Sequence, residues 1–422
     1  MDNRQINFQD GAYENLVTGV GSMLSDKTEH DHVRPVRLLD YKTIGYIYAN
    51  DGLGKRIVNK VADGALFHGF AIDGDEKGKL YSIADKVIGQ NKFIEASRAT
   101  RRAGGALMLL RVADNQELDV PIGRGAIVGA SVHSAGMIQL IDFKKDTDEP
   151  EFFTIVFPNG NVARVHESRV IQFFGDKLPD EIASFGDIRQ MFFGVGALQG
   201  LVSGLSKFDI AITETVNLLA ESNIRVTSID GFNNLLSQNK EDAQRILACR
   251  TRANKLSMSV LRQIIQDKND STTIQTNSFA GIDSCILAIQ RMVSAVSGLS
   301  MSAIFGESAS GLNATGEGDK KNDNDVIKAW QSYCLSAPMS KLFRLLNEHN
   351  GGGLNTGDPC SITFAPLYQP TPSETADIQQ KNAVTLKTLW ECEALDANQI
   401  RAIISNGGLA EPLNISLSGI AK

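Results

Sequence analysis

The stretch IFGESASGLNATGEGDKKNDNDVIKAW, residues 304–330, separates two helical parts of the chain and is its most informative segment. Between Gly306 and Asp325 it holds four glycines, five carboxylates and two adjacent lysines, and an apolar pattern of helical spacing follows. A glycine-rich loop that leads into a helix is a common cradle for phosphate. The stretch therefore raises three alternatives: a nucleotide site, a metal site, or a surface that meets a phosphate polymer.

The nucleotide alternative fits poorly. A phosphate-binding P-loop needs a lysine and then Ser or Thr directly after its last glycine, and a buried strand in front of it. Here Leu312 follows Gly311, Glu317 follows Gly316, and the pattern before the loop is helical. The stretch does not predict a nucleotide site.

The metal alternative is also weak. Asp319, Asp323 and Asp325 have the close spacing of a calcium loop, but the central Gly and the terminal Glu of an EF-hand are not in their places. Helix-start chemistry explains these acids better, with Asn322 or Asp323 as the N-cap and the carboxylates opposing the helix dipole. No metal site and no cofactor are predicted.

Long amphipathic helices lie on both sides of a polar segment. One helix at about 196–221 carries apolar residues at steps of three and four: Leu198, Leu201, Leu205, Phe208, Ile212, Val216 and Leu219. A second helix covers about 281–299. A third, from about 323 to 347, contains Pro338, where a kink is expected because proline removes one backbone hydrogen bond.

The remaining elements alternate in type. We expect helices at 51–64 and 81–102, strands at 69–73 and 106–112, and five strands between 120 and 175 with an Asn-Gly hairpin in FPNGN. His166, after that hairpin, is expected to order the strand end. Residues 224–280 combine a polar helix (240–256) with strand-like runs at 259–266 and 272–279. The tail adds a strand in SITFAPL and helices at 374–391 and 397–405. The fold class is α+β.

Composition limits the function classes. The 422 residues are 42% hydrophobic and 22% charged, typical of a folded chain, and the net charge of −7 argues against tight wrapping by nucleic acid. No apolar run reaches the roughly 18 residues of a membrane span. The five scattered cysteines are expected to be buried thiols in a reducing compartment. No GxSxG, HExxH or Cys–His arrangement is present, so the chain is not expected to be an enzyme.

Three stretches carry a family resemblance: VHESRVIQFFG (165–175), IFGESASGLNATGEGDKKNDNDVI (304–327) and ITFAPLYQPTPSETADIQQKNAVTLKTL (362–389). Together they resemble portal proteins of tailed bacteriophages, in the branch with a GLNATGE-type loop. The resemblance extends from about residue 40 to 410. Family loops continue into aromatic residues where this chain has Asn322, Asp323 and Asn324, so the packing at that helix start is expected to differ. Some relatives add a C-terminal phosphodiesterase domain that antagonises host nucleotide signalling. The sequence up to Lys422 has no paired His-x-Thr or His-x-Ser motif for it, and we do not expect that activity.

The resemblance implies a layout of parts. These are an N-terminal arm (1–39), a mixed α/β wing (40–195), a stem helix (196–221), a small αβ clip (222–280), a second stem helix (281–300), a tunnel loop (301–322), a kinked wing helix (323–348) and a short helical crown region (349–422). The clip is the basic part of an acidic chain: between Lys240 and Asp270, seven basic residues stand against four acids.

The resemblance also implies a function: a ring, typically a dodecamer, at one capsid vertex. It would be the channel for packaging and ejection of double-stranded DNA. Expected partners are the terminase large subunit, the head–tail adaptor, and capsid and scaffolding proteins, with assembly in the host bacterial cytoplasm and a final place in the virion. The alternative is a nucleotide- or phosphodiester-hydrolysing phage enzyme.

Candidate DNA-channel residues are Glu307, Ser308, Ser310, Asn313, Thr315, Glu317, Asp319, Lys320 and Lys321, with the acids keeping DNA retention low. Candidate partner-binding residues of the clip are Lys240, Arg245, Arg252, Lys255, Arg262 and Lys268.

Overall fold

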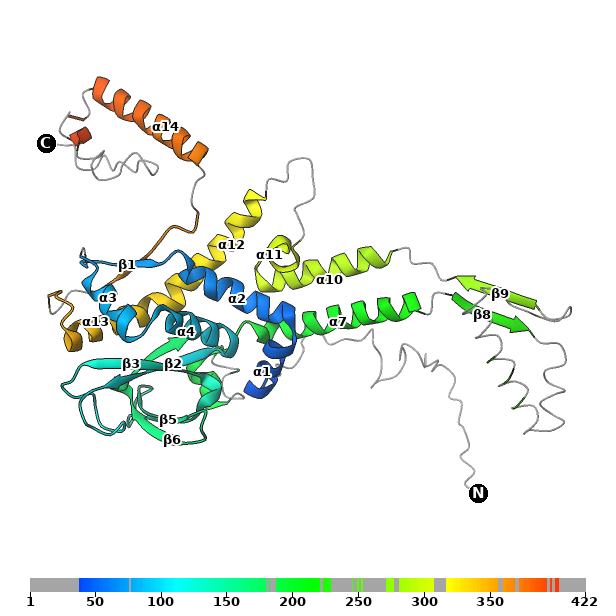
Figure 1. Cartoon of the computed structure of the whole chain (residues 1–422), viewed down its shortest axis with the longest axis horizontal. Coiled ribbons are helices and arrows are strands. Elements are labelled where there is room, and N and C mark those ends of the chain that lie inside the picture. The colour runs from blue at the N-terminus through cyan, green and yellow to red at the C-terminus, as the bar shows by residue number, and fades with distance from the viewer. Residues whose placement is uncertain are drawn as a thin grey trace.

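The structure of the chain is a computed structural model. It describes residues 38–75, 77–179, 187–220, 223–228, 271–276, 281–306, 316–355, 360–368 and 372–392, with a few single residues elsewhere. A body of helices and small sheets carries a pair of helices that project from it (Figure 1). The predicted α+β class is confirmed in this form.

Two three-stranded antiparallel sheets form the core of the body. One has the order β3-β2-β7, from Ile127–Ser134, Gly105–Val112 and Val170–Phe174, and the other has the order β4-β5-β6, from Ile138–Phe143, Pro150–Val156 and Val162–His166. Successive side chains of β2 point to opposite faces of the sheet, and both faces are buried. Met108 and Leu110 face the helices, whereas Leu107 and Leu109 face the second sheet. All these strands were predicted, and the FPNGN turn closes β5 and β6 with Gly160 at φ +84°.

Helices α3 (Lys79–Val87) and α4 (Gln90–Ala103) pack on the first sheet, and α1 (Tyr41–Asn50) and α2 (Gly52–Phe67) pack on α4. In α2 the predicted face is confirmed, because Ile57, Val58 and Val61 are fully buried. The single helix expected at 81–102 is wrong. Gly89, at φ +80°, ends the path of α3 and starts α4 in a new direction, and the sequence pattern does not show this break because both halves are amphipathic.

The projecting pair consists of α7 (Leu198–Ala220) and α10 (Ile282–Ser297), which lie side by side (Figure 1). Beyond them lies an antiparallel strand pair, β8 (Asn223–Ser228) and β9 (Ser271–Thr276). Both helices were predicted, as was a strand at β9, but β8 was missed. Its signal is the two-residue spacing of Ile224 and Val226. The strand expected at 259–266 lies outside the described residues.

A close backbone contact fixes where α7 leaves the body. The segment before it follows α6 (Ile188–Phe193) and crosses the end of α4. A Cβ atom on Gly196 would lie 2.0 Å from the carbonyl oxygen of Arg102, so only glycine fits. One helical turn further, a Cβ on Gly200 would meet nothing nearer than Val296, at 3.8 Å.

After α10 come α11 (Met301–Phe305), α12 (Glu317–Trp330), a π-helical turn (Gln331–Leu335) and α13 (Ser336–Asn350). The helix that was expected to begin at 323 begins at Glu317, and its N-cap is Gly316 rather than Asn322 or Asp323. The irregularity expected at Pro338 lies just before it, in the π turn, where the Ser336 N–H donates to the Gln331 carbonyl. Proline has no N–H to pair with the carbonyl four residues earlier, so a widened turn fits there.

The described tail pairs β10 (Ile362–Phe364) with β1 (Phe70–Ile72), and α14 (Pro372–Glu391) lies apart from the body (Figure 1). Most of the helix expected at 397–405 lies outside the described residues. The expectation of buried cysteines holds for Cys334 and Cys360 only, and the other three are exposed. In the described part of the chain, no helix has both the length and the apolar character of a membrane span.

Candidate functional site

The segment that joins α10 to α11 is held by two carboxylates of α12. Asp323, 8% exposed, accepts hydrogen bonds from the backbone N–H and the hydroxyl of Ser300, each at 2.7 Å. One turn earlier, Asp319 accepts a bond of 2.8 Å from the Ser302 hydroxyl. Ser300 is also the N-cap of α11 and accepts from Ala303 N. These acids therefore join α12 to the start of α11 rather than facing solvent together.

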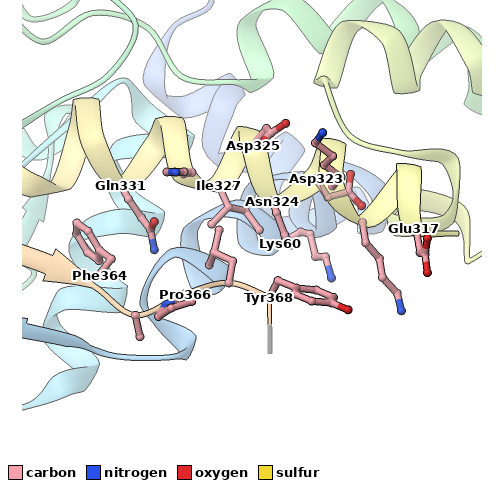
Figure 2. A pocket seen from close by; sticks show the side chains of 15 residues that line it. Lys60, Glu317, Asp323, Asn324, Asp325, Ile327, Gln331, Phe364, Pro366 and Tyr368 are labelled. Atoms are coloured by element: carbon pink, nitrogen blue, oxygen red, sulfur yellow. The ribbon is translucent and has the colours of Figure 1, made fainter. Parts of the chain in front are cut away.

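An adjoining face of α12 forms one wall of a groove of about 1150 Å³, and Asp323 lies at its edge. The other wall is the segment 364–368, and Lys60 of α2 lies between them (Figure 2). Lysines 60, 320, 321 and 328 are all exposed along the groove, and no ion pair between described residues involves any of them. The floor is apolar, with Ile327, Phe364 and Leu367.

The predicted channel residues thus separate into two groups. Glu317, Asp319, Lys320 and Lys321 lie in the first turns of α12, so the expectation that 301–322 is a loop is wrong for 301–305 and for 317–322. Asp319 is half-buried against Ser302, whereas Lys320 and Lys321 point away from α11 to the groove. The other candidates, Glu307, Ser308, Ser310, Asn313 and Thr315, lie outside the described residues.

Of the predicted clip residues, Arg245 and Arg252 are described and exposed. Lys240, Lys255, Arg262 and Lys268 lie outside the described residues. The described residues therefore do not test whether these basic side chains form one surface. Their role as a partner-binding set stays a prediction.

The projecting helix α7 is apolar beyond its buried portion. Leu198, Leu201 and Leu205 are buried where α7 leaves the body. Further out, Ile212 is 38% and Val216 58% exposed, although both belong to the predicted stripe. Exposure of apolar side chains to water is unfavourable, so apolar side chains on a long projecting helix favour contact with a protein partner.

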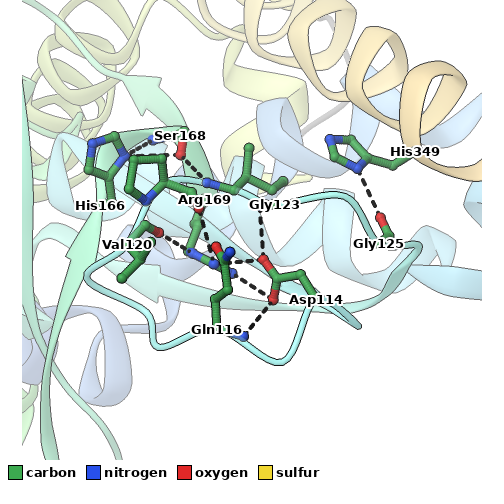
Figure 3. A network of polar contacts seen from close by, with 11 residues as sticks. Asp114, Gln116, Val120, Gly123, Gly125, His166, Ser168, Arg169 and His349 are labelled. Atoms are coloured by element: carbon green, nitrogen blue, oxygen red, sulfur yellow. Dashed lines mark hydrogen bonds and ion pairs between the residues drawn. The ribbon is translucent and has the colours of Figure 1, made fainter.

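The HESR part of the first diagnostic stretch forms a buried clamp (Figure 3). Arg169, 1% exposed, donates to the Asp114 carboxylate at 2.7 Å and to the carbonyl of Val120 at 2.7 Å. The Arg169 guanidinium, with the Gly123 N–H, lowers the pKa of Asp114 to about 2. His166 accepts from Ser168 N, which confirms that it orders the strand end. The clamp fixes the loop 113–126 against the sheets, so this motif is structural.

Few side chains in the described part of the chain are placed to bind a metal ion or to act in catalysis. Among the described residues there is no group of three or more His, Cys, Asp or Glu side chains that could hold a metal ion. His349 and His166 are engaged with the Gly125 carbonyl and Ser168. Burial raises the pKa of the Cys334 thiol to about 12, which suppresses the nucleophilic thiolate.

Comparison with known proteins identifies the class of this fold. The family model described as "Phage portal protein" matches residues 42–388, most of the chain. The chain belongs to this family of phage portal proteins. A curated relative, the "Anti-CBASS protein Acb1" of Sphingomonas paeninsulae, is 26% identical over 400 residues. That alignment covers 91% of this chain but 62% of the relative, so the chain spans about three fifths of the relative's length.

Solved structures agree on the fold. The chain resembles a protein in the neck of an empty GTA particle computed with C6 symmetry, with a TM-score of 0.54 and 12% identity over 88% of this chain and 94% of that one. It also resembles a protein in the neck of a native GTA particle computed with C12 symmetry, with a TM-score of 0.52 and 13% identity over 83% and 90%. These similarities show that the chain shares the fold of these neck proteins.

Proposed function

We propose that this protein forms a ring, a dodecamer, at one capsid vertex, and that double-stranded DNA enters and leaves the particle through its channel. The terminase large subunit and the head–tail adaptor would dock on the ring, and capsid and scaffolding proteins would surround it. Two findings support the proposal: the chain belongs to the family of phage portal proteins, and it resembles a protein in the neck of a native GTA particle computed with C12 symmetry. The GLNATGE motif further suggests the branch of the family with that loop.

The parts of the chain follow from this proposal. The body at 40–195 would be the wing, and α7 and α10 would be the stem. The segment 222–280, which contains β8 and β9, would be the clip. Residues 307–315, held at their base by Asp319 and Asp323, would be the tunnel loop. The kinked helix at 323–348 would return to the wing, and residues 349–422 would form the crown region.

The observation that carries the ring is the exposed apolar outer half of α7. In a single chain, Ile212 and Val216 are partly exposed to water, at 38% and 58%, so the cost relative to full burial is roughly half of the about 1.5–3 kcal/mol of a fully exposed side chain. A ring in which each stem packs against the next buries the same side chains in every subunit. A closed ring repeats this gain at every interface.

Electron microscopy of the purified protein tests the ring directly. We expect annular particles with a central hole, and class averages that give the number of subunits. A stable monomer that hydrolyses ATP would contradict the proposal.

Matched variants test the apolar contact. Ile212→Glu with Val216→Glu should abolish rings, since charges replace buried apolar groups. Thr213→Glu with Asn217→Glu adds the same charge at exposed polar positions of the same turns and should leave rings intact. Loss of rings in both pairs, or in neither, would refute the role of the apolar face.

Within the channel, we propose that Lys320 and Lys321 make weak contacts with the DNA backbone. Lysines that contact phosphates give salt-dependent attraction without reading sequence. Lys320→Ala with Lys321→Ala should change the amount or retention of packaged DNA while rings still assemble. Unchanged packaging and retention at several salt concentrations would show that these lysines do not contact DNA.

The competing function is an enzyme that hydrolyses nucleotides or phosphodiesters. In the described part of the chain, Ser131 lies 2.9 Å from the His133 ring and Ser168 lies 2.9 Å from the His166 ring, but neither pair lines the groove beside α12. The anti-CBASS relative is longer than the aligned region. We therefore propose that this chain works as a channel and docking ring and carries out no catalytic step. Incubation of the purified ring with ATP and with cyclic oligonucleotides, followed by chromatography of the products, tests this.

A further inference from the structure

The groove beside α12 continues into a second hollow. That hollow, of about 500 Å³, shares Lys60, Asn324, Ile327 and Leu367 with the first and ends at Phe67. Two large aromatic side chains therefore border one continuous groove: Phe67, 78% exposed, and Tyr368, 54% exposed. Exposed aromatic side chains around an apolar floor mark a surface that binds another segment of protein.

Lysines outnumber exposed acids along the rim of the groove. Lys60, Lys320, Lys321 and Lys328 line it together with the exposed acids Glu317 and Asp325, while Asp323 and Asp63, which also border it, are engaged elsewhere. Asp63 pairs with Arg98, and Asp323 accepts its two bonds from Ser300. A ligand that fits must offer apolar side chains for the floor and carboxylates for the rim.

The N-terminal segment of the chain has this composition. Residues 1–32 contain six acids and two basic residues, a net charge of −4 out of −7 for the whole chain. They also contain a run of apolar residues interspersed with acids: Phe8, Asp10, Tyr13, Glu14, Leu16, Val17 and Val20. Fully extended, 32 residues reach on the order of 100 Å, so the segment can reach the groove of its own subunit or of a neighbour.

DNA fits this groove less well than a peptide does. A phosphate backbone would satisfy the lysines but would leave Ile327, Leu367 and the two aromatic side chains against a charged polymer. An amphipathic acidic peptide satisfies both the rim and the floor.

We propose that the groove between α12 and residues 364–368 is the docking site of the acidic N-terminal segment, residues 8–32, of a portal subunit. The apolar residues of the segment cover the floor, and its carboxylates face the lysines. Docking covers Lys320 and Lys321, so the segment would compete with DNA for these two lysines. This competition with DNA rests on the proposed function, whereas docking of the N-terminal segment in the groove does not depend on it.

Site-specific photo-crosslinking in the full chain tests the docking. In one protein, p-benzoylphenylalanine replaces Tyr368. In the control protein it replaces Tyr333, which is 85% exposed but does not line the groove. After irradiation of purified protein without DNA, mass spectrometry should find residues 8–32 joined to position 368, within or between subunits, and not to position 333. Products from position 368 that map elsewhere, or equal yields from both positions, overturn the proposal.

Charge reversal gives a second measurement. Lys60→Glu with Lys328→Glu should lower the yield from position 368 by up to about tenfold, the effect of losing two exposed ion pairs. Lys86→Glu with Lys145→Glu makes the same change of charge at exposed lysines outside the groove and should leave the yield unchanged. Equal loss in both pairs would show a general charge effect and refute docking at this groove. Ring formation, followed by microscopy, reports separately on the proposed function.

Discussion

Replacement of Asp323 by alanine should release the segment that joins α10 to α11. The carboxylate is buried and accepts two hydrogen bonds of 2.7 Å from Ser300, one from the backbone N–H and one from the hydroxyl. Hydrogen bonds to a charged group contribute roughly 1.5–3 kcal/mol each, and two bonds on one residue are not fully additive. We therefore expect a local loss of about 2–4 kcal/mol.

Hydrogen exchange followed by mass spectrometry measures this loss where it occurs. Each 1.4 kcal/mol changes an opening equilibrium about tenfold, so exchange of peptides covering 298–306 should accelerate by roughly 30- to 1000-fold. Asp323→Asn keeps one acceptor oxygen and should give an intermediate acceleration. Peptides from β2 and β3 should not change.

The matched control is Asp325→Ala, two residues further along the same helix. Asp325 is exposed and has no ion pair with another described residue, so its loss should change protection by less than about 0.5 kcal/mol. If Asp323→Ala and Asp325→Ala behave alike, the two bonds to Ser300 do not hold the segment. The assignment of the base of the tunnel loop would then fail.

Three further predictions concern the body and the base of α7. The pKa of Asp114 is lowered from 3.8 to about 2, so the ionised carboxylate stabilises the fold fully above pH 4, and this stabilisation is lost as the pH falls toward 2. Urea unfolding midpoints should show this loss in the wild type and not in Arg169→Met. Gly196→Ala should lower the melting temperature strongly, whereas Gly200→Ala should leave it unchanged or raise it, as calorimetry will show. A thiol reagent at pH 8 should label the three exposed cysteines of the native chain rapidly, and rapid labelling of Cys334 would contradict its burial.

The β-rich part of the body was predictable because its signals are local. The apolar run of β2, the strand-length apolar runs of β3 to β7 and the Asn-Gly turn each depend on residues within a few positions of one another. The break at Gly89 was not predictable in this way, since the pattern is amphipathic on both sides of it. The clamp of Arg169 on Asp114 joins residues 55 apart in sequence, so no local pattern could reveal it.

The exposed part of the stem shows a different limit. The stripe that predicted α7 is apolar along its whole length, yet only its inner part is buried in one chain. Periodicity reports which side chains require burial, but it does not say whether the chain itself or a second copy buries them. Ile212 and Val216 thus follow the prediction for the helix and, by their exposure, support the ring.

The start of α12 shows why the candidate site could be predicted only in part. Gly316 and Gly318 are poor helix formers, so the sequence favours a loop up to Asn322. The bonds from Ser300 and Ser302 to Asp323 and Asp319 stabilise the helix from outside it. Once residue 317 is helical, the 3.6-residue repeat divides a cluster of mixed charge into two faces. The acids at 319 and 323 turn toward Ser302 and Ser300, and the role of Asp319 in the channel stays a prediction. The two lysines turn outward, where phosphate or the acidic N-terminal segment can reach them.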